Sequence, residues 1–253
     1  MPRERIPTNS DMARIFYNRG SVSISLFLAL DSLARSTIVA TRNIPPNQCS
    51  KPTGLLGRFT LWRMNSGHSR LTDWGLEHVS VANHFTILDV GCGGGRTVSK
   101  LTALATRGKV YGVDYSDESV AATKRTNARS IDLGRVEIRH GSVSHLPFPD
   151  AMFDLITAVE THFWWPDLPS DMREVFRVLK PGGALTLIAE IYKGAHTTAA
   201  KLVEKYASRT GITLLSVDEH RELFASAGYS NVQVVEERPK GWICAIGTKP
   251  AAS

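Results

Sequence analysis

The stretch that decides the fold is FTILDVGCGGG, residues 85–95. An apolar run ends at Asp89, after which Gly91, Gly93 and Gly95 alternate with other residues. This pattern predicts a strand, a tight turn and then the start of a helix. Glycine permits a positive φ and lets a ligand approach the backbone closely. Open α/β sheets bind nucleotide-like ligands at the carboxyl ends of their strands, so we expect such a ligand here.

Two ligand classes use a turn of this kind. Dinucleotide-binding folds require G-x-G-x-x-G, and counting from Gly91 the third glycine falls at position 96, which is Arg96. Counting from Asp89, the spacing is D-x-G-x-G-x-G instead. In this form the stretch resembles motif I of the class I methyltransferases, which bind S-adenosylmethionine. The resemblance implies that the backbone of residues 91–95, Cys92 included, passes under the methionine part of this cofactor, with Asp89 near its amino group.

From residue 85 onward, strand and helix patterns alternate. This alternation predicts an α/β fold with a Rossmann-like, mostly parallel sheet and helices on both faces. The last two strands are joined only by Arg238-Pro239-Lys240, which predicts an antiparallel terminal hairpin, and class I methyltransferases end in the same way. The predicted strands are 85–90, 109–113, 135–140, 153–159, 184–191, 231–237 and 241–248, and the predicted helices are 96–106, 117–130, 168–179 and 218–227.

Further motifs extend the resemblance over about residues 80 to 190. Leu146-Pro147-Phe148 and the later run 153–156 resemble a stretch of the ubiquinone/menaquinone-type methyltransferases. The segment RVLKPGG, residues 177–183, resembles the turn that follows a helix in these methyltransferases. We expect Pro181 to stop the helix and the two glycines to reverse the chain.

Asp114 ends the second predicted strand, 19 residues beyond Gly95. Rossmann-like folds place an acid there to accept both ribose hydroxyls, and we expect this role for Asp114, with Tyr115 along the adenine. In the family, the turn after the third strand lines the adenine edge. The resemblance therefore assigns Gly141, Ser142 and Val143 to the cofactor site, although many relatives carry an acid where this chain has Ser142.

The fourth predicted strand runs into Glu160-Thr-His-Phe-Trp-Trp165. His162 titrates near neutral pH and is a candidate to accept a proton from the methyl acceptor. Glu160 is a candidate to orient His162, to bind a cationic substrate or to touch the cofactor. Trp164 and Trp165 offer aromatic faces to an acceptor, and Tyr192 follows the fifth strand on the same side. A second histidine, His68, lies before a predicted helix and is a further proton-handling candidate. By contrast, the helix 216–227, with His220, reads as a solvated amphipathic face.

The first 53 residues differ in composition from the rest. They carry a net charge of +4 out of +6 for the chain, so the remaining 200 residues are nearly balanced, which disfavours nucleic acid as a partner. We expect residues 1–53 to be an extension and linker, and 54–253 to be the methyltransferase domain with an N-terminal helical cap at 54–80. The apolar run 21–30 is too short to span a membrane. Two interpretations of the extension stay open, a targeting presequence and a helix that packs on the domain.

Three cysteines without C-x-x-C spacing argue against a metal site or a disulfide framework and favour a reducing compartment, the cytoplasm. A mitochondrial or other organellar location through the extension is the alternative. We expect in-line methyl transfer from S-adenosylmethionine to a small molecule. The rival interpretations are an NAD(P)-dependent oxidoreductase, disfavoured by Arg96 and the lack of a Tyr-x-x-x-Lys pair, and a non-catalytic S-adenosylmethionine-binding protein.

Overall fold

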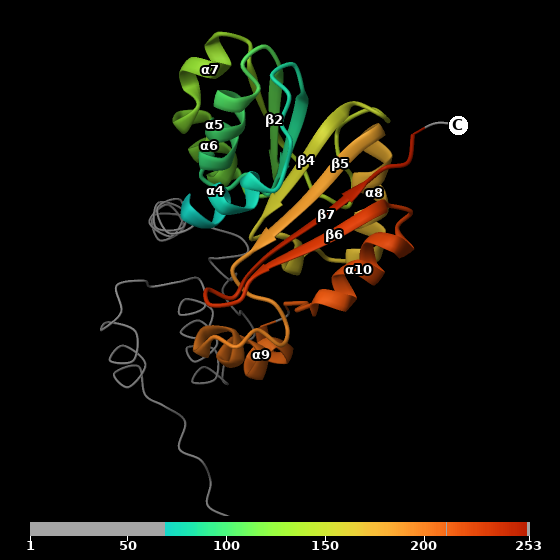
Figure 1. The fold of residues 1–253 in the computed structure, drawn as a ribbon. Coiled ribbons are helices and arrows are strands. Elements are labelled where there is room, and N and C mark those ends of the chain that lie inside the picture. The colour runs from blue at the N-terminus through green and yellow to red at the C-terminus, as the bar shows by residue number, and fades with distance from the viewer. Residues whose placement is uncertain (1–68, 211, 252–253) are drawn as a thin grey trace, which may run out of the picture.

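The computed structural model describes residues 69–210 and 212–251 of the chain. In this part, one sheet of seven strands lies between layers of helices (Figure 1). The strands are β1 (Thr86–Val90), β2 (Lys109–Asp114), β3 (Val136–His140), β4 (Phe153–Val159), β5 (Leu179–Ala189), β6 (Ser230–Glu237) and β7 (Trp242–Thr248). The helices are α4 (Ser69–Glu77), α5 (Arg96–Leu104), α6 (Asp117–Thr126), α7 (Ala128–Asp132), α8 (Leu168–Val178), α9 (Thr198–Thr210) and α10 (Val217–Ser226), with a 3-10 turn, η1 (His162–Trp164).

The strand order is β3-β2-β1-β4-β5-β7-β6. The strands from β1 to β5 pair in parallel, whereas β7 is antiparallel to both β5 and β6. This arrangement confirms the predicted Rossmann-like sheet with its antiparallel final strand. The chain order turns around between β1 and β4, and ligands bind at such a switch point in open α/β sheets.

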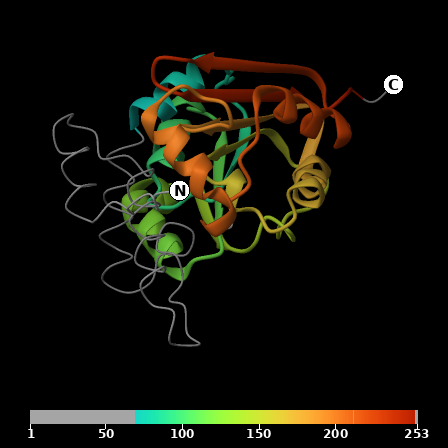
Figure 2. The same ribbon diagram turned by 90° about the horizontal axis from the view of Figure 1, so that it is seen from below.

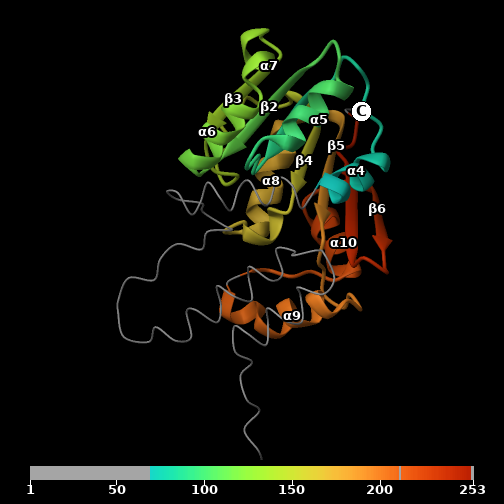
Figure 3. The same cartoon turned by 90° about the vertical axis from the view of Figure 1, so that its left-hand side faces the viewer.

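Alternate residues of the strands face two different hydrophobic cores, as expected for a sheet covered on both sides. Ile87 of β1 packs in a core with Val98 and Leu101 of α5. Its neighbour Leu88 packs on the opposite face, in a core that includes Met172 of α8. Helices α4 and α5 therefore cover one face and α8 and α10 the other, as Figure 3 shows from the side.

Helix α9 lies apart from both layers, beyond the carboxyl ends of the strands (Figures 1 and 2). Its residues Ala200 and Val203 form a small core with Phe163 of η1 and Ile191, which follows β5. The sequence patterns predict no helix or strand within residues 192–216 and no helical turn after β4, so α9 and η1 are additions to the predicted fold. Both elements lie at the carboxyl ends of the parallel strands, where we expect ligands to bind.

The segment 177–183 differs from its prediction. Helix α8 ends at Val178, but Pro181 and the glycines do not form a separate turn, because β5 already begins at Leu179. They form an irregularity in β5 opposite Phe153 and Leu155 of β4. Gly182 N donates to Lys249 O and Lys249 N donates to Gly183 O, each at 2.8 Å, so the chain end holds this stretch in the sheet.

Helix α4 lies within the range 54–80 that we expect to form the helical cap. Residues 54–68 and the proposed boundary near residue 53 lie outside the described residues, so the division into extension and domain stays a prediction. Within the described ranges, none of the helices combines the length and apolar character that crossing a membrane requires.

Candidate functional site

The glycine turn after β1 is built by backbone that only glycine adopts readily. Gly91, Gly93 and Gly95 have φ values of +73°, +52° and +84°. Gly91 N donates to Val113 O of β2 at 2.8 Å, and Gly95 N donates to Cys92 O at 2.8 Å. The turn therefore closes tightly over the carboxyl ends of β1 and β2, and α5 begins directly after it.

Helix α6 clamps this turn from one side, a contact that the sequence analysis missed. Thr123 Oγ1 donates to Gly93 O at 2.8 Å, Thr126 Oγ1 donates to Gly94 O at 2.8 Å, and Asn127 Nδ2 donates to Gly95 O at 3.0 Å. Residues 123, 126 and 127 stand at positions i, i+3 and i+4, which share one face of a helix. This spacing was the signal in the sequence that the three polar side chains act together. The clamp orders the turn without using a ligand.

Asp114, the last residue of β2, faces the same turn. Its Oδ2 accepts a hydrogen bond from Gly93 N at 2.9 Å, and its Oδ1 accepts one from Ser116 N at 3.0 Å. The side chain is buried, and burial raises the pKa of Asp114 despite these bonds. Ser116 is itself the N-cap of α6. A carboxylate accepts up to about four hydrogen bonds, so Asp114 keeps acceptor capacity for a ribose hydroxyl beside its bonds to Gly93, Ser116 and Ser119.

Asp89 lies within β1, before the turn, and is buried. Its Oδ1 accepts a hydrogen bond from Thr157 Oγ1 of β4 at 2.7 Å. Burial raises the pKa of Asp89 to about 7, with Asp114 adding to the rise and Thr157 opposing it. A cationic group placed beside Asp89 favours the ionised carboxylate, so the predicted contact with an amino group is chemically consistent.

The residues predicted for the adenine side follow the carboxyl ends of β2 and β3. Tyr115 is 41% exposed, and its carbonyl oxygen lies 3.0 Å from His140 Nε2. Gly141 N donates to Asp114 O at 3.0 Å, which brings the turn after β3 beside β2. Ser142 is exposed, and its Oγ accepts from Ser144 N at 3.2 Å, whereas Val143 is buried in the core.

Cys92 sits inside the turn as a buried free thiol. Burial raises the pKa of this thiol well above its usual value, with Asp114 and Asp89 adding to the rise. A thiol that stays protonated is a poor nucleophile, so Cys92 acts here as a small apolar residue.

Glu160 is the first residue after β4, and its backbone has φ +60°. It is 3% exposed, and its Oε1 accepts a hydrogen bond from Glu190 N at the end of β5. Its other oxygen, Oε2, has no hydrogen-bond partner within residues 69–210 and 212–251. Burial and the neighbouring Glu190 raise the pKa of Glu160 well above its usual value.

His162 begins η1 and is 3% exposed. Its Nε2 lies 3.4 Å from Nε2 of His220 on α10. His220 is 1% exposed, so the prediction that it belongs to a solvated helix face was wrong. The capping box of Ser216 and Glu219 sets where α10 begins, and this places His220 on the inner face of the helix. The sequence pattern did not reveal that a second histidine would meet His162.

Comparison with known proteins adds to this geometry. Residues 88–187 match the sequence family described as the methyltransferase domain. This segment of the chain is therefore similar to a methyltransferase domain. The match begins in β1 and ends in β5, so it includes the glycine turn, Asp114 and Glu160. The resemblance to class I methyltransferases drawn from the motifs is thereby confirmed.

Relatives of the methyltransferase domain include the methyltransferase GfsG of Streptomyces halstedii, which is 31% identical over 179 residues. The O-methyltransferase cnsE of Penicillium expansum is 28% identical over 152 residues, and the demethylmenaquinone methyltransferase of Listeria welshimeri is 38% identical over 103 residues. These alignments cover 68%, 60% and 40% of this chain. They span 64%, 54% and 43% of the relatives, which is less than two thirds of each.

Solved structures show the same fold. The CurJ carbon methyltransferase superposes with a TM-score of 0.71 at 14% identity, covering 98% of this chain and 72% of that one. A SAM dependent methyltransferase from Aquifex aeolicus gives a TM-score of 0.62 at 20% identity, covering 76% of this chain and 97% of that one.

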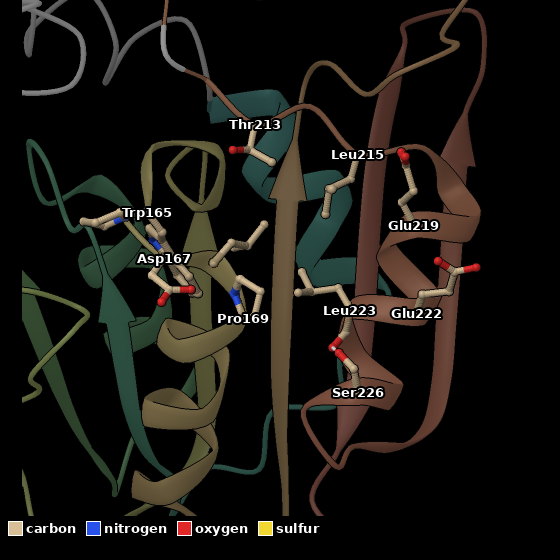
Figure 4. Close-up of a pocket in the computed structure, with 11 residues that line it drawn as sticks. Trp165, Asp167, Pro169, Thr213, Leu215, Glu219, Glu222, Leu223 and Ser226 are labelled. Carbon is tan, nitrogen blue, oxygen red and sulfur yellow. Dashed lines mark hydrogen bonds between the residues drawn. The ribbon is translucent and has the colours of Figure 1, made fainter. Parts of the chain in front are cut away.

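The aromatic residues predicted to contact the acceptor are packed in the interior, after the carboxyl ends of β4 and β5. Tyr192 is buried in the small core with Phe163, and Trp164 packs against that core. Trp165 is buried and lines a groove of about 770 Å³ between the start of α8 and α10, which Figure 4 shows in close-up. Their contact with an acceptor remains a prediction. His68 lies outside the described residues.

Proposed function

We propose that this protein transfers a methyl group from S-adenosylmethionine to a small-molecule acceptor by in-line displacement. The observation that carries the proposal is the glycine turn after β1, which is clamped by α6 and faces Asp114 of β2. S-adenosylmethionine, when bound, supplies an activated methyl group and a neutral leaving group. The protein therefore mainly has to align donor and acceptor, and alignment alone supplies a large part of the rate enhancement.

Different residues contact different parts of the cofactor in this proposal. The turn at residues 91–95 lies under the methionine part, and Asp89 lies close to its amino group. Asp114 binds the ribose hydroxyls, and the exposed ring of Tyr115 lies along the adenine with the turn 141–143 at its edge. The relatives named above include an O-methyltransferase and a demethylmenaquinone methyltransferase, which supports a small organic acceptor rather than a macromolecule.

The acceptor side follows from the parallel sheet. The carboxyl ends of β4 and β5 neighbour the turn, so Glu160, with Thr161 and His162 after it, flanks the place where the methyl group is presented. His162 has a lone pair on Nδ1 without a partner in the described residues and is our candidate to take a proton when the acceptor has one to lose. Burial and His220 lower the pKa of His162, so the imidazole is neutral before transfer and holds such a proton only briefly.

Transfer of a labelled methyl group tests the proposal. The purified full chain is incubated with S-adenosylmethionine labelled in the methyl group and with pools of phenols, quinols, amines, thiols and halides. We expect label in one pool, and none in reactions that contain Gly91→Ala in place of the wild type. A chain that binds S-adenosylhomocysteine but labels no pool is a binding protein, and the proposed activity is then wrong.

A further inference from the structure

Glu160 has three properties that alignment of a donor and an acceptor does not by itself require. It is an ionisable residue placed in the interior, its backbone is in the left-handed region at φ +60°, and one of its carboxyl oxygens has no partner in the described structure. A non-glycine residue in this backbone region is strained, and such strain persists where the surroundings hold a side chain in place. A buried polar atom without a partner is uncommon and calls for an explanation.

The carboxyl group is held firmly across the ends of two strands. Glu160 N donates to Ile188 O of β5 at 2.9 Å, and Glu160 Oε1 accepts from Glu190 N. These two bonds fix both the backbone and one oxygen of the side chain. The remaining oxygen, Oε2, is thus presented in a fixed position and free to meet a ligand.

The next residue in the chain touches the glycine turn. Thr161 Oγ1 donates to Val90 O at 3.2 Å, and a Cβ built on Gly91 would clash with Thr161 Cγ2. Glu160 is therefore one residue away from a direct contact with the turn that we assign to the methionine part of the cofactor. Its carboxyl group flanks the place where the methyl group leaves the donor.

The electrostatic surroundings select the charge of the ligand. Burial disfavours the carboxylate form of Glu160, and Glu190, from the end of β5, disfavours it further. A ligand cation relieves both effects, because it takes the place of the proton that the carboxyl group otherwise keeps. A neutral or anionic ligand group gives no such relief.

We propose that Glu160 is the recognition group for a basic nitrogen on the acceptor, so that the substrate class is an amine. This inference rests on the proposed methyl transfer. The bound ammonium gives one proton to Glu160, and the freed lone pair of the nitrogen forms the N–CH3 bond. The CH3–S bond breaks at the same time, and its electron pair stays on the sulfur of a neutral thioether. The nitrogen takes over the positive charge that the sulfonium loses, and Glu160 releases its proton to solvent.

Sinefungin provides a probe, because it is an analogue of the cofactor in which an ammonium group takes the place of the sulfonium methyl. Binding of sinefungin, S-adenosylmethionine and S-adenosylhomocysteine to the full chain is measured by calorimetry. We expect sinefungin to bind at least about tenfold tighter than S-adenosylhomocysteine, the scale of one hydrogen bond to a charged group. In Glu160→Gln, this preference disappears while S-adenosylhomocysteine still binds. Glu222→Gln, which changes an exposed acid on α10, serves as the control and keeps the preference.

A second measurement uses the wild type alone and so does not depend on how the variant folds. Calorimetry at pH 7 in two buffers with different ionisation enthalpies counts protons. We expect sinefungin binding to release about one proton more than S-adenosylhomocysteine binding, because the ammonium displaces the proton of Glu160.

The possible outcomes distinguish failure of the amine inference from failure of the proposed methyl transfer. If wild type and Glu160→Gln prefer sinefungin equally, the inference is overturned. If the substitution weakens S-adenosylmethionine as much as sinefungin, Glu160 faces the donor sulfonium, and the amine acceptor is overturned. If the wild type binds none of the three compounds, the proposed function itself fails.

Discussion

The imidazole rings of His162 and His220 meet edge to face in the interior, with their Nε2 atoms 3.4 Å apart. His220 Nδ1 lies 2.7 Å from the carbonyl oxygen of Ser216, so this nitrogen carries the proton and donates it. In neutral His220, Nε2 is then an acceptor, and His162 Nε2 must be the donor. His162 Nδ1 is left as a buried lone pair with no partner in the described part of the chain.

This geometry predicts opposite tautomers for the two rings. Nitrogen-15 NMR of histidine-labelled protein at pH 7.5 should show His220 protonated at Nδ1 and His162 protonated at Nε2. In His220→Phe the partner of His162 Nε2 is lost, and the His162 signals should change. If both rings have the same tautomer in the wild type, the hydrogen-bond chain is wrong.

The same pair makes stability depend on pH. Burial lowers the pKa of both histidines. The neighbouring His220 lowers the pKa of His162 further, whereas the hydrogen bond to Ser216 and the charge of Glu219 partly oppose the lowering for His220. The unfolded chain therefore binds protons near pH 6.5 that the folded chain refuses, and the free energy of unfolding falls as pH drops below 6.5. His220→Phe should flatten this fall by up to about 1.4 kcal/mol per pH unit, measured by urea unfolding between pH 7 and 5. His196→Gln, at an exposed position, should leave it unchanged.

Asp89 acts in the opposite direction. Because its pKa is raised to about 7 on folding, the folded chain keeps a proton that the unfolded chain loses, and stability falls as pH rises from about 4 to 7. Asp89→Asn should remove this loss and leave stability at pH 8 no lower than that of the wild type. It should also weaken S-adenosylhomocysteine binding at pH 8, where the carboxylate is ionised. A variant that is destabilised at pH 8 contradicts the assigned pKa.

Asp114→Ala should weaken S-adenosylhomocysteine binding by about 1.5–3 kcal/mol, the scale of a hydrogen bond to a charged group. Calorimetry measures this loss, and Asp132→Ala, at an exposed position on α7, is the matched control. Asp114 also holds Gly93 and Ser116, so thermal unfolding must show that the variant is folded at the temperature of the experiment. Unchanged affinity would remove Asp114 from the site.

Gly91 and Gly134 offer a matched pair of alanine substitutions. Both have a positive φ, +73° and +71°, so each alanine costs about 1–2 kcal/mol of stability through backbone strain. At Gly134 the new methyl group meets nothing within 4 Å, whereas at Gly91 it meets Thr161. Gly91→Ala should therefore be the less stable variant in urea unfolding and should also lose S-adenosylhomocysteine affinity, which Gly134→Ala should keep. Equal affinity in the two variants would contradict the position of the turn.

The strands of the central sheet were predictable because their signals are local, whereas the order of the strands was not predicted. Apolar runs end in glycine or an acid, and helical spacing separates them, so β1, β2 and α5 are found within one or two residues of their predicted bounds. The short loop before Trp242 likewise predicts the antiparallel hairpin of β6 and β7. These features depend on the residues next to them and on little else.

The errors come from contacts between segments far apart in the chain. Thr126 caps the glycine turn from 32 residues away, and His220 meets His162 across 58 residues. The spacing within a single segment can place such a residue on a helix face, but it does not identify the distant partner. Pro181 and the glycines after it suggest that a helix ends in a turn here, but hydrogen bonds between these glycines and Lys249 make the segment part of β5. The site is thus predictable where one loop forms it and unpredictable where distant elements complete it.

The central claim is that the turn at residues 91–95 binds a sulfonium nucleoside. Calorimetry of the purified full chain with S-adenosylhomocysteine, and separately with NADH, tests it most directly. The account predicts one S-adenosylhomocysteine bound per chain and no heat from NADH. Binding of NADH without binding of S-adenosylhomocysteine would contradict it.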